Sequence, residues 1–213
     1  MNWHDHSEWI YDEHAFLSPS KKTWVNYDDE ALIKNYKSYL TQPKLGTAVH
    51  DLASRLISKE HKLTKTEWCL VCWELEDIYN LPRFAVTKSM IFENLRLFVN
   101  DSITYKCRTE QRLIYTPHAF GKADAIQLID NTLYIFDLKT GANPADIDQL
   151  ISYAALFCLE YNVKPSNLKF DLRLYQFDSI ITDPDITPEI VEARMKVYVH
   201  HNDILNKVDG GLL

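Results

Sequence analysis

Apolar residues recur three or four positions apart through most of the first hundred positions of the chain. This spacing gathers them on one face of a helix, and it predicts helices over residues 28–40, 47–59, 66–79 and 83–100. A short helix containing Trp24 is expected before them, capped by Ser18 or Ser20. The first half of the chain is therefore expected to be mainly helical.

The pattern changes to alternation after position 104. Residues 105–116 predict a strand, residues 120–141 a β-hairpin and residues 168–177 a further strand. A helix is expected from Asn143-Pro144 to about Tyr161, and a closing helix over residues 187–206. This order predicts an α/β fold, with a mixed central β-sheet flanked by helices and additional helices on its N-terminal side.

Composition favours a single domain over residues 1–213. The chain is 46% hydrophobic and has five glycines, so it can bury a full core and has little material for linkers. We expect an N-terminal arm at residues 1–16, a mainly helical region at 17–100, a sheet-and-helix region at 101–180 and a C-terminal helix region at 181–213.

The hairpin has a strong turn signal. Asp130-Asn131 suits a two-residue turn with positive φ, which pairs Ile129 with Thr132 and makes opposed residue numbers sum to 261. Asp124 then falls opposite Asp137, and Lys139 shares the face of Asp137 because side chains alternate along a strand.

Two opposed carboxylates need compensation. Their Cβ atoms would lie about 4.5–5.5 Å apart, and like charges at that distance destabilise a sheet unless a cation lies between them. Lys139 supplies only one positive charge, so the pair Asp124 and Asp137 favours a divalent metal over a simply solvated hairpin end.

Five short motifs occur in a fixed order around this hairpin. They are L-S-P-S at residues 17–20 with Trp24, G-T-A-V-H at 46–50, G-K-A-D at 121–124, D-L-K at 137–139 and Q-L-I-S-Y at 149–153. Together they resemble the motifs of the PD-(D/E)XK nuclease superfamily. The Q-x-x-x-Y motif is similar to that of the exonuclease-like branch, which includes bacterial recombination nucleases, phage lambda-type exonucleases and many phage or prophage nucleases. The resemblance covers about residues 17–177.

The resemblance implies a metal-dependent DNA nuclease, with region 101–180 as its catalytic part. An exonuclease on linear DNA, in phage or bacterial recombination, repair or degradation, is the form expected. Its Mg²⁺ ion, with Mn²⁺ as a substitute, would be held by His50, Asp124, Asp137 and the backbone carbonyl of Leu138.

The same resemblance assigns catalytic roles. Lys139 would position or deprotonate the attacking water, and Gln149 and Tyr153 would orient that water, Lys139 or the substrate backbone. Glu110 would touch the metal, a water or Lys139, although a charge pair with Arg108 or Arg112 explains it equally well. His50, taken alone, is also compatible with a hydrogen-bonded structural role.

Two other functions stay open. An RNA-cleaving nuclease could use the same metal site, and a catalytically inactive nucleic-acid or protein-binding module could keep the nuclease fold. The sequence contains no P-loop motif that would power translocation.

A net charge of −7 argues against a broad basic surface for DNA. Binding would require basic groups gathered around a cleft, or delivery of the substrate by a recombination partner protein or a homo-oligomeric channel. The basic candidates are Lys21, Lys22, Arg83, Lys88, Arg108, Arg112, Lys122 and Lys139.

The four cysteines include a C-x-x-C pair at Cys69 and Cys72. This pair lies inside a predicted helix and no cysteine follows Cys158, so we expect small core residues and no iron–sulfur cluster. Free thiols, the absence of a secretory signal and the absence of a long apolar run indicate a cytoplasmic protein, in the host cell if a phage encodes it.

Two further sets of residues have alternative interpretations. His4, His6 and His14 could form a metal tract, but a packed or mobile arm is favoured. The aromatic residues of the helical region are expected in the core rather than in a base-stacking platform, namely Trp68, Trp73, Phe84, Phe92 and Phe98.

Overall fold

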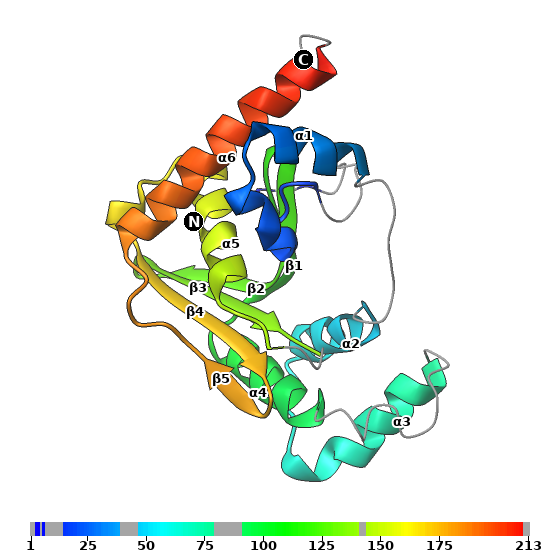
Figure 1. The fold of residues 1–213 in the computed structure, drawn as a ribbon. Helices are drawn as coiled ribbons and strands as arrows, with labels where there is room; N and C mark the ends of the chain where they lie inside the picture. Colours follow the sequence, from blue (N-terminus) through cyan, green and yellow to red (C-terminus); the bar gives the residue numbers. More distant parts are fainter. Residues whose placement is uncertain are drawn as a thin grey trace.

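A computed structural model describes residues 3, 4, 6, 15–38, 47–78, 91–140 and 144–210. In chain order the elements are η1 (Pro19–Asn26), α1 (Asp29–Ser38), α2 (Thr47–Ser58), η2 (Lys65–Glu67), α3 (Trp68–Ile78), α4 (Ile91–Thr104), β1 (Arg108–Thr116), β2 (Ala119–Ile129), β3 (Thr132–Leu138), α5 (Asp148–Glu160), η3 (Pro165–Asn167), β4 (Lys169–Gln176), β5 (Ser179–Ile181) and α6 (Pro188–Asp209) (Figure 1).

The described part of the chain forms a mixed sheet in the order β1-β2-β3-β4-β5. Strands β3 and β4 are parallel, and the other neighbouring pairs are antiparallel. The parallel pair needs a crossover, which α5 provides. This arrangement confirms the predicted α/β fold with a mixed sheet flanked by helices. Strand β5 is an addition that the sequence pattern did not predict.

Helices cover both faces of the sheet (Figure 1). On one face α5 packs on the sheet, and η1 and α6 pack against α5. On the other face lie α2 and α4, with α3 beside them. Leu133 and Ile135 enter the first core, whereas Phe136 and Leu138 enter the second, so the predicted alternation of β3 is confirmed.

The hairpin turn is also confirmed. Asp130 and Asn131 have φ of 48° and 61°, and Ile129 pairs with Thr132. The antiparallel pairing follows the predicted register as far as Ala125 and Phe136 and then stops. Asp124 and Asp137 therefore lie just beyond the regular ladder, and they are not the cross-strand pair that the register predicts.

The first turn of η1 forms as its sequence indicates. Ser18 is the N-cap, and its Oγ accepts a hydrogen bond from the Ser20 backbone N–H. Trp24 is buried and donates its indole N–H to the Ser18 carbonyl at 2.9 Å. This contact closes the short helix against the core.

The prediction of a buried aromatic set is wrong for α3. Trp68 is 44% exposed and Trp73 63% exposed, because Val71 and Leu75 occupy the inward side of this helix. Phe98 is buried as predicted, Phe92 is partly buried, and Phe84 lies outside the described residues.

Cys107 and Cys158 are buried core residues, whereas Cys69 is partly exposed. Burial raises the pKa of both buried thiols to about 12, so they stay protonated at neutral pH. The side chain of Cys72 lies outside the description. Among the described helices, none is both long and apolar enough to cross a membrane.

Candidate active site

Three side chains from three elements converge at the open end of the hairpin. His50 comes from the first turn of α2, Glu110 from β1 and Asp124 from β2, and one ligand atom of each lies within 4.8 Å of the others. Nδ1 of His50 is 3.2 Å from Oδ1 of Asp124. The predicted association of His50 with Asp124 is present, and Glu110 belongs to the same cluster. Gly46 of the G-x-x-x-H motif is outside the described residues.

Both strands change face at this cluster. Ala123 lies in the first core but Ala125 in the second, although residues two apart should share a face. Cys107, just before β1, and Leu113 within it likewise lie in opposite cores, and between them Glu110 has φ of 52°. A positive φ raises the conformational free energy of a non-glycine residue in a strand. Backbone strain of this kind concentrates at functional sites.

Asp124 is fixed by the neighbouring strand. Its Oδ2 accepts a hydrogen bond from the Leu138 backbone N–H at 2.9 Å. This bond replaces the ladder contact that the simple register predicts, and it turns the Leu138 peptide group toward the cluster. Asp124 is therefore held from two sides, by Leu138 and by His50.

Asp137, Lys139 and Gln149 form a second, connected group. The Gln149 side-chain amide donates to Oδ1 of Asp137 at 2.9 Å and accepts from the Lys139 ammonium at 2.6 Å. The ammonium is 2.9 Å from Oδ2 of Asp137 and forms an ion pair with it. Asp137 is 2% exposed, so its charge depends on the Lys139 ammonium and the Gln149 amide.

Tyr153 lies one helical turn after Gln149 on α5, as the Q-x-x-x-Y spacing requires. Its buried hydroxyl donates to the Lys122 carbonyl at 2.7 Å. A Cβ added to Gly121 would lie 2.7 Å from Pro19 Cδ and 3.1 Å from Tyr153 Cε1. Gly121 and Tyr153, from two different motifs, therefore pack against each other. The missing side chain of Gly121 lets η1 and α5 lie close to β2.

The sequence indicates Lys122 only as one basic group among several. In the structure its ammonium lies 2.5 Å from Oε2 of Glu110, so it holds that carboxylate in the cluster. The signal that could have singled it out is its position inside the G-x-x-D motif, on a strand beside β1. The expected charge pair of Glu110 thus exists, with Lys122 in place of Arg108 or Arg112.

His50 and Asp124 stabilise each other's charged forms. Burial alone would lower the pKa of His50, but the charge and hydrogen bond of Asp124, with Asp137 and Glu110 behind it, raise it to about 9. Burial would raise the pKa of Asp124, yet His50, Lys139 and the Leu138 N–H lower it. In this state His50 is an imidazolium paired with an ionised Asp124.

The pKa values of the other two carboxyl groups, those of Asp137 and Glu110, are raised. Burial raises the pKa of Asp137 against the effect of Lys139, and the nearby charge of Asp124 raises it further. Burial also raises the pKa of Glu110 despite the bond from Lys122. Lys139 has a raised pKa because, although burial lowers it, Asp137 and Asp124 both favour its charge. A cluster with such opposed shifts is typical of functional sites.

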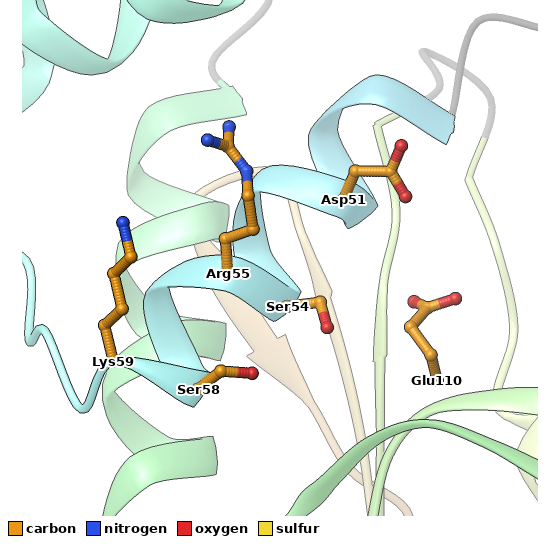
Figure 2. A pocket seen from close by; sticks show the side chains of 6 residues that line it. All are labelled: Asp51, Ser54, Arg55, Ser58, Lys59 and Glu110. Carbon is orange, nitrogen blue, oxygen red and sulfur yellow. The ribbon is translucent and has the colours of Figure 1, made fainter.

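A pocket of about 480 Å³ opens beside the cluster, between α2 and β1. Figure 2 shows Asp51 and Glu110 toward one side of it and Arg55 and Lys59 toward the other. Ser54 and Ser58 complete the lining; Ser54 is also hydrogen-bonded to Thr109 at 2.8 Å. Sequence reasoning missed Arg55 and Lys59 as a basic pair, although they stand four residues apart at the end of α2, where the Lys59 N–H still donates to the Arg55 carbonyl.

The donor set fits a divalent cation. It combines the imidazole of His50 with the carboxylates of Glu110 and Asp124, and the buried carboxylate of Asp137 interacts electrostatically with His50 and Asp124. Carboxylate-rich sets suit Mg²⁺ and Mn²⁺, which keep some of their waters, and a single imidazole is compatible with both. The excess of negative charge would be compensated by such an ion.

The fold and this cluster define the chain as a mixed α/β domain with a histidine–carboxylate–lysine site at a hairpin end. It belongs to the family described as a protein of unknown function, DUF2800, whose sequence model matches residues 14–156. That span contains every residue of the candidate site, from His50 to Tyr153. Searches of curated proteins and of solved structures give no match.

Proposed function

We propose that this protein is a Mg²⁺-dependent nuclease of the PD-(D/E)XK type that hydrolyses phosphodiester bonds in DNA. The observation that carries the proposal is the convergence of His50, Glu110 and Asp124, whose ligand atoms lie within 4.8 Å of one another and whose charges interact with the buried Asp137–Lys139 ion pair. Carboxylates that would repel one another are brought together there, and a bound divalent cation would compensate their charge.

In this proposal His50, Asp124, Asp137 and the Leu138 carbonyl hold the ion, and Glu110 supports the same site. The bound ion would polarise the scissile phosphate and lower the pKa of a water molecule. Binding requires His50 to lose the proton that Asp124 now stabilises, because only a neutral imidazole can be a ligand. Glu110 keeps its position through Lys122.

Lys139 places a positive charge where the phosphate oxygen would bind. Its raised pKa keeps it protonated in this state, so its first role is to offset phosphate charge rather than to accept a proton. Gln149 orients Lys139 through the 2.6 Å bond and orients Asp137 through the 2.9 Å bond. Tyr153 acts one step away, by holding the Lys122 carbonyl.

The pocket beside the site suits a nucleic-acid backbone. Arg55 and Lys59 supply positive charge, and Ser54 and Ser58 supply hydroxyl groups, without any base-reading arrangement. The ion pair of Arg55 with Glu74 is exposed on both sides, so a phosphate could replace Glu74 at small cost. Local charge of this kind offsets the acidic net charge of the chain, and a partner protein or a second copy could add to it.

Exonuclease action on linear DNA is favoured, in phage or bacterial recombination, repair or degradation, because of the Q-x-x-x-Y resemblance. The reaction would take place in the cytoplasm, where Cys107 and Cys158 stay reduced. RNA cleavage is the second candidate, since the backbone contacts proposed here do not distinguish the two sugars.

The test uses labelled linear duplex, closed circular and single-stranded DNA, together with RNA, each with Mg²⁺, Mn²⁺ or EDTA. Wild type should degrade linear DNA with either metal and fail in EDTA. Asp137→Asn should lose cleavage, since it removes a hard oxygen ligand. Glu192→Gln, which alters only an exposed pair with Lys196, is the matched control and should cut like wild type.

Three results would redirect the proposal. Cleavage of RNA with DNA spared would move it to the RNA-cleaving alternative. Cutting of closed circles with linear DNA spared would replace the exonuclease by an endonuclease. Metal-independent binding of nucleic acid, with no cleavage by wild type, would identify an inactive binding module.

A further inference from the structure

A second cluster of potential metal ligands lies far from the candidate active site. His4 Nδ1 is 2.8 Å and His6 Nε2 is 2.6 Å from the same oxygen, Oε1 of Glu160. The three ligand atoms lie within 4.8 Å of one another. Glu160 is the last residue of α5, eleven positions beyond Gln149, so the clusters are separated by about 16 Å along this helix.

The carboxylate is built into the fold. Its side chain is 4% exposed, and its Oε2 accepts the Ile114 backbone N–H of β1 at 2.7 Å. This bond fixes the carboxylate plane and leaves Oε1 facing the two imidazoles. Carboxylates that act as metal ligands are oriented by partners of this kind.

The first histidine is also held in place. The His4 ring stacks on Tyr161 with centroids 4.1 Å apart, and its backbone N–H donates to the Tyr161 hydroxyl at 3.0 Å. Trp3 packs edge-on against Phe157 and Tyr161, and the Arg108 guanidinium lies over its ring. These contacts bring the N-terminal arm to Glu160 without requiring an ion.

We propose that His4, His6 and Glu160 form a Zn²⁺-binding site that ties the N-terminal arm to the end of α5 and to β1. In a tetrahedral Zn²⁺ site, bonds of about 2.0–2.1 Å place the donors about 3.3 Å apart. The present separations of 2.6 and 2.8 Å are those of imidazole N–H donors on one oxygen, so a small outward movement would let one ion replace those protons.

The donor set selects the metal. Two imidazoles and one carboxylate favour a borderline ion such as Zn²⁺ over Mg²⁺, which prefers oxygen ligands. Three protein ligands leave a fourth position for water. The site is independent of the proposed nuclease activity, and its occupancy can be tested without a cleavage assay.

The experiment measures Zn²⁺ bound per chain by equilibrium dialysis of EDTA-treated full-length protein, followed by elemental analysis. The parent protein carries Cys69→Ser, which removes a thiol that could bind Zn²⁺, and every variant is made in this parent. The active site can also bind this metal, so the difference between variants is the informative quantity. His6→Gln should bind roughly one Zn²⁺ fewer than its parent.

His61→Gln is the matched control. His61 makes a similar 2.8 Å contact with Glu67 but belongs to no group of three potential ligands found in the described structure. It should bind as much Zn²⁺ as the parent. His4→Gln, at a residue nearly half exposed, provides a second variant that should fold if His6→Gln does not.

Melting temperature gives a second measurement. Zn²⁺ should raise that of the parent and of His61→Gln, because an ion that binds only the folded state stabilises it. The rise should be smaller in His4→Gln and His6→Gln, and Mg²⁺ should not produce the difference. Equal Zn²⁺ content in the parent and in folded His4→Gln or His6→Gln would overturn the proposal, and would leave a hydrogen-bonded contact between arm and helix.

Discussion

Gly121 offers the sharpest test of how the motifs are assembled. Its backbone does not adopt a positive φ, so conformational freedom is not the reason for glycine here. The reason is space, since a Cβ would lie 2.7 Å from Pro19 Cδ, closer than carbon atoms can approach, and 3.1 Å from Tyr153 Cε1. Gly121→Ala must push η1 or Tyr153 away from β2.

Overpacking of this kind costs about 1–3 kcal/mol. For a domain of this size each kcal/mol lowers the melting temperature by about 2–4 °C, so we expect a fall of about 2–12 °C. Urea denaturation followed by tryptophan fluorescence would give the free energy of unfolding directly, because Trp24 lies in the affected core. The midpoint should fall with little change in slope.

Gly210→Ala is the control. Gly210 has φ of −76° at the end of α6, and its added Cβ would meet two carbonyl oxygens at 3.3 and 3.7 Å. This replacement should stay within about 1 kcal/mol of wild type. If Gly121→Ala were as stable as Gly210→Ala, the close approach of η1, β2 and α5 would not be the reason for the glycine.

Three further predictions address charge and hydrogen bonding. Lys139→Ala should retain metal affinity in calorimetry but lose about 10²–10³-fold in cleavage rate because the charge that offsets the phosphate is removed, and an unchanged rate would remove Lys139 from the mechanism. Tyr153→Phe should lose about 0.5–1.5 kcal/mol in urea denaturation because it removes the hydrogen bond from the Tyr153 hydroxyl to the Lys122 carbonyl, and an unchanged midpoint would show that this bond does not stabilise the fold. Burial lowers the pKa of His201, so the unfolded chain binds its proton first. Stability should be complete above pH about 6.5 and fall below it, by at most about 1.4 kcal/mol per pH unit, and His201→Gln should reduce this slope.

Part of this protein could be predicted from the sequence because the physics involved is local. Asp130-Asn131 set the hairpin turn, since these residues tolerate positive φ, and the turn set the register of β2 and β3. Periodicity predicted the helices and the two faces of β3 for the same reason. The turn and the alternation together were therefore enough to place Asp124, Asp137 and Lys139 near one another.

The detailed geometry of the site was decided by tertiary structure. The predicted ladder stops before Asp124, and that carboxylate bonds to the Leu138 N–H because both strands change face there. No periodic pattern predicts the positive φ of Glu110 or the ion pair between Lys122 and Glu110. These features depend on how β1 pairs with β2 and how α2 packs against β1, and alternation carries no information about either.

Long-range packing also decided what lies on the surface. Trp68 and Trp73 have the composition of core residues, yet α3 turns Val71 inward and leaves both exposed. His4 and His6 meet Glu160 across more than 150 positions of sequence. Spacing along the chain determines which residues share an element, whereas the packing of whole elements determines which of those elements meet.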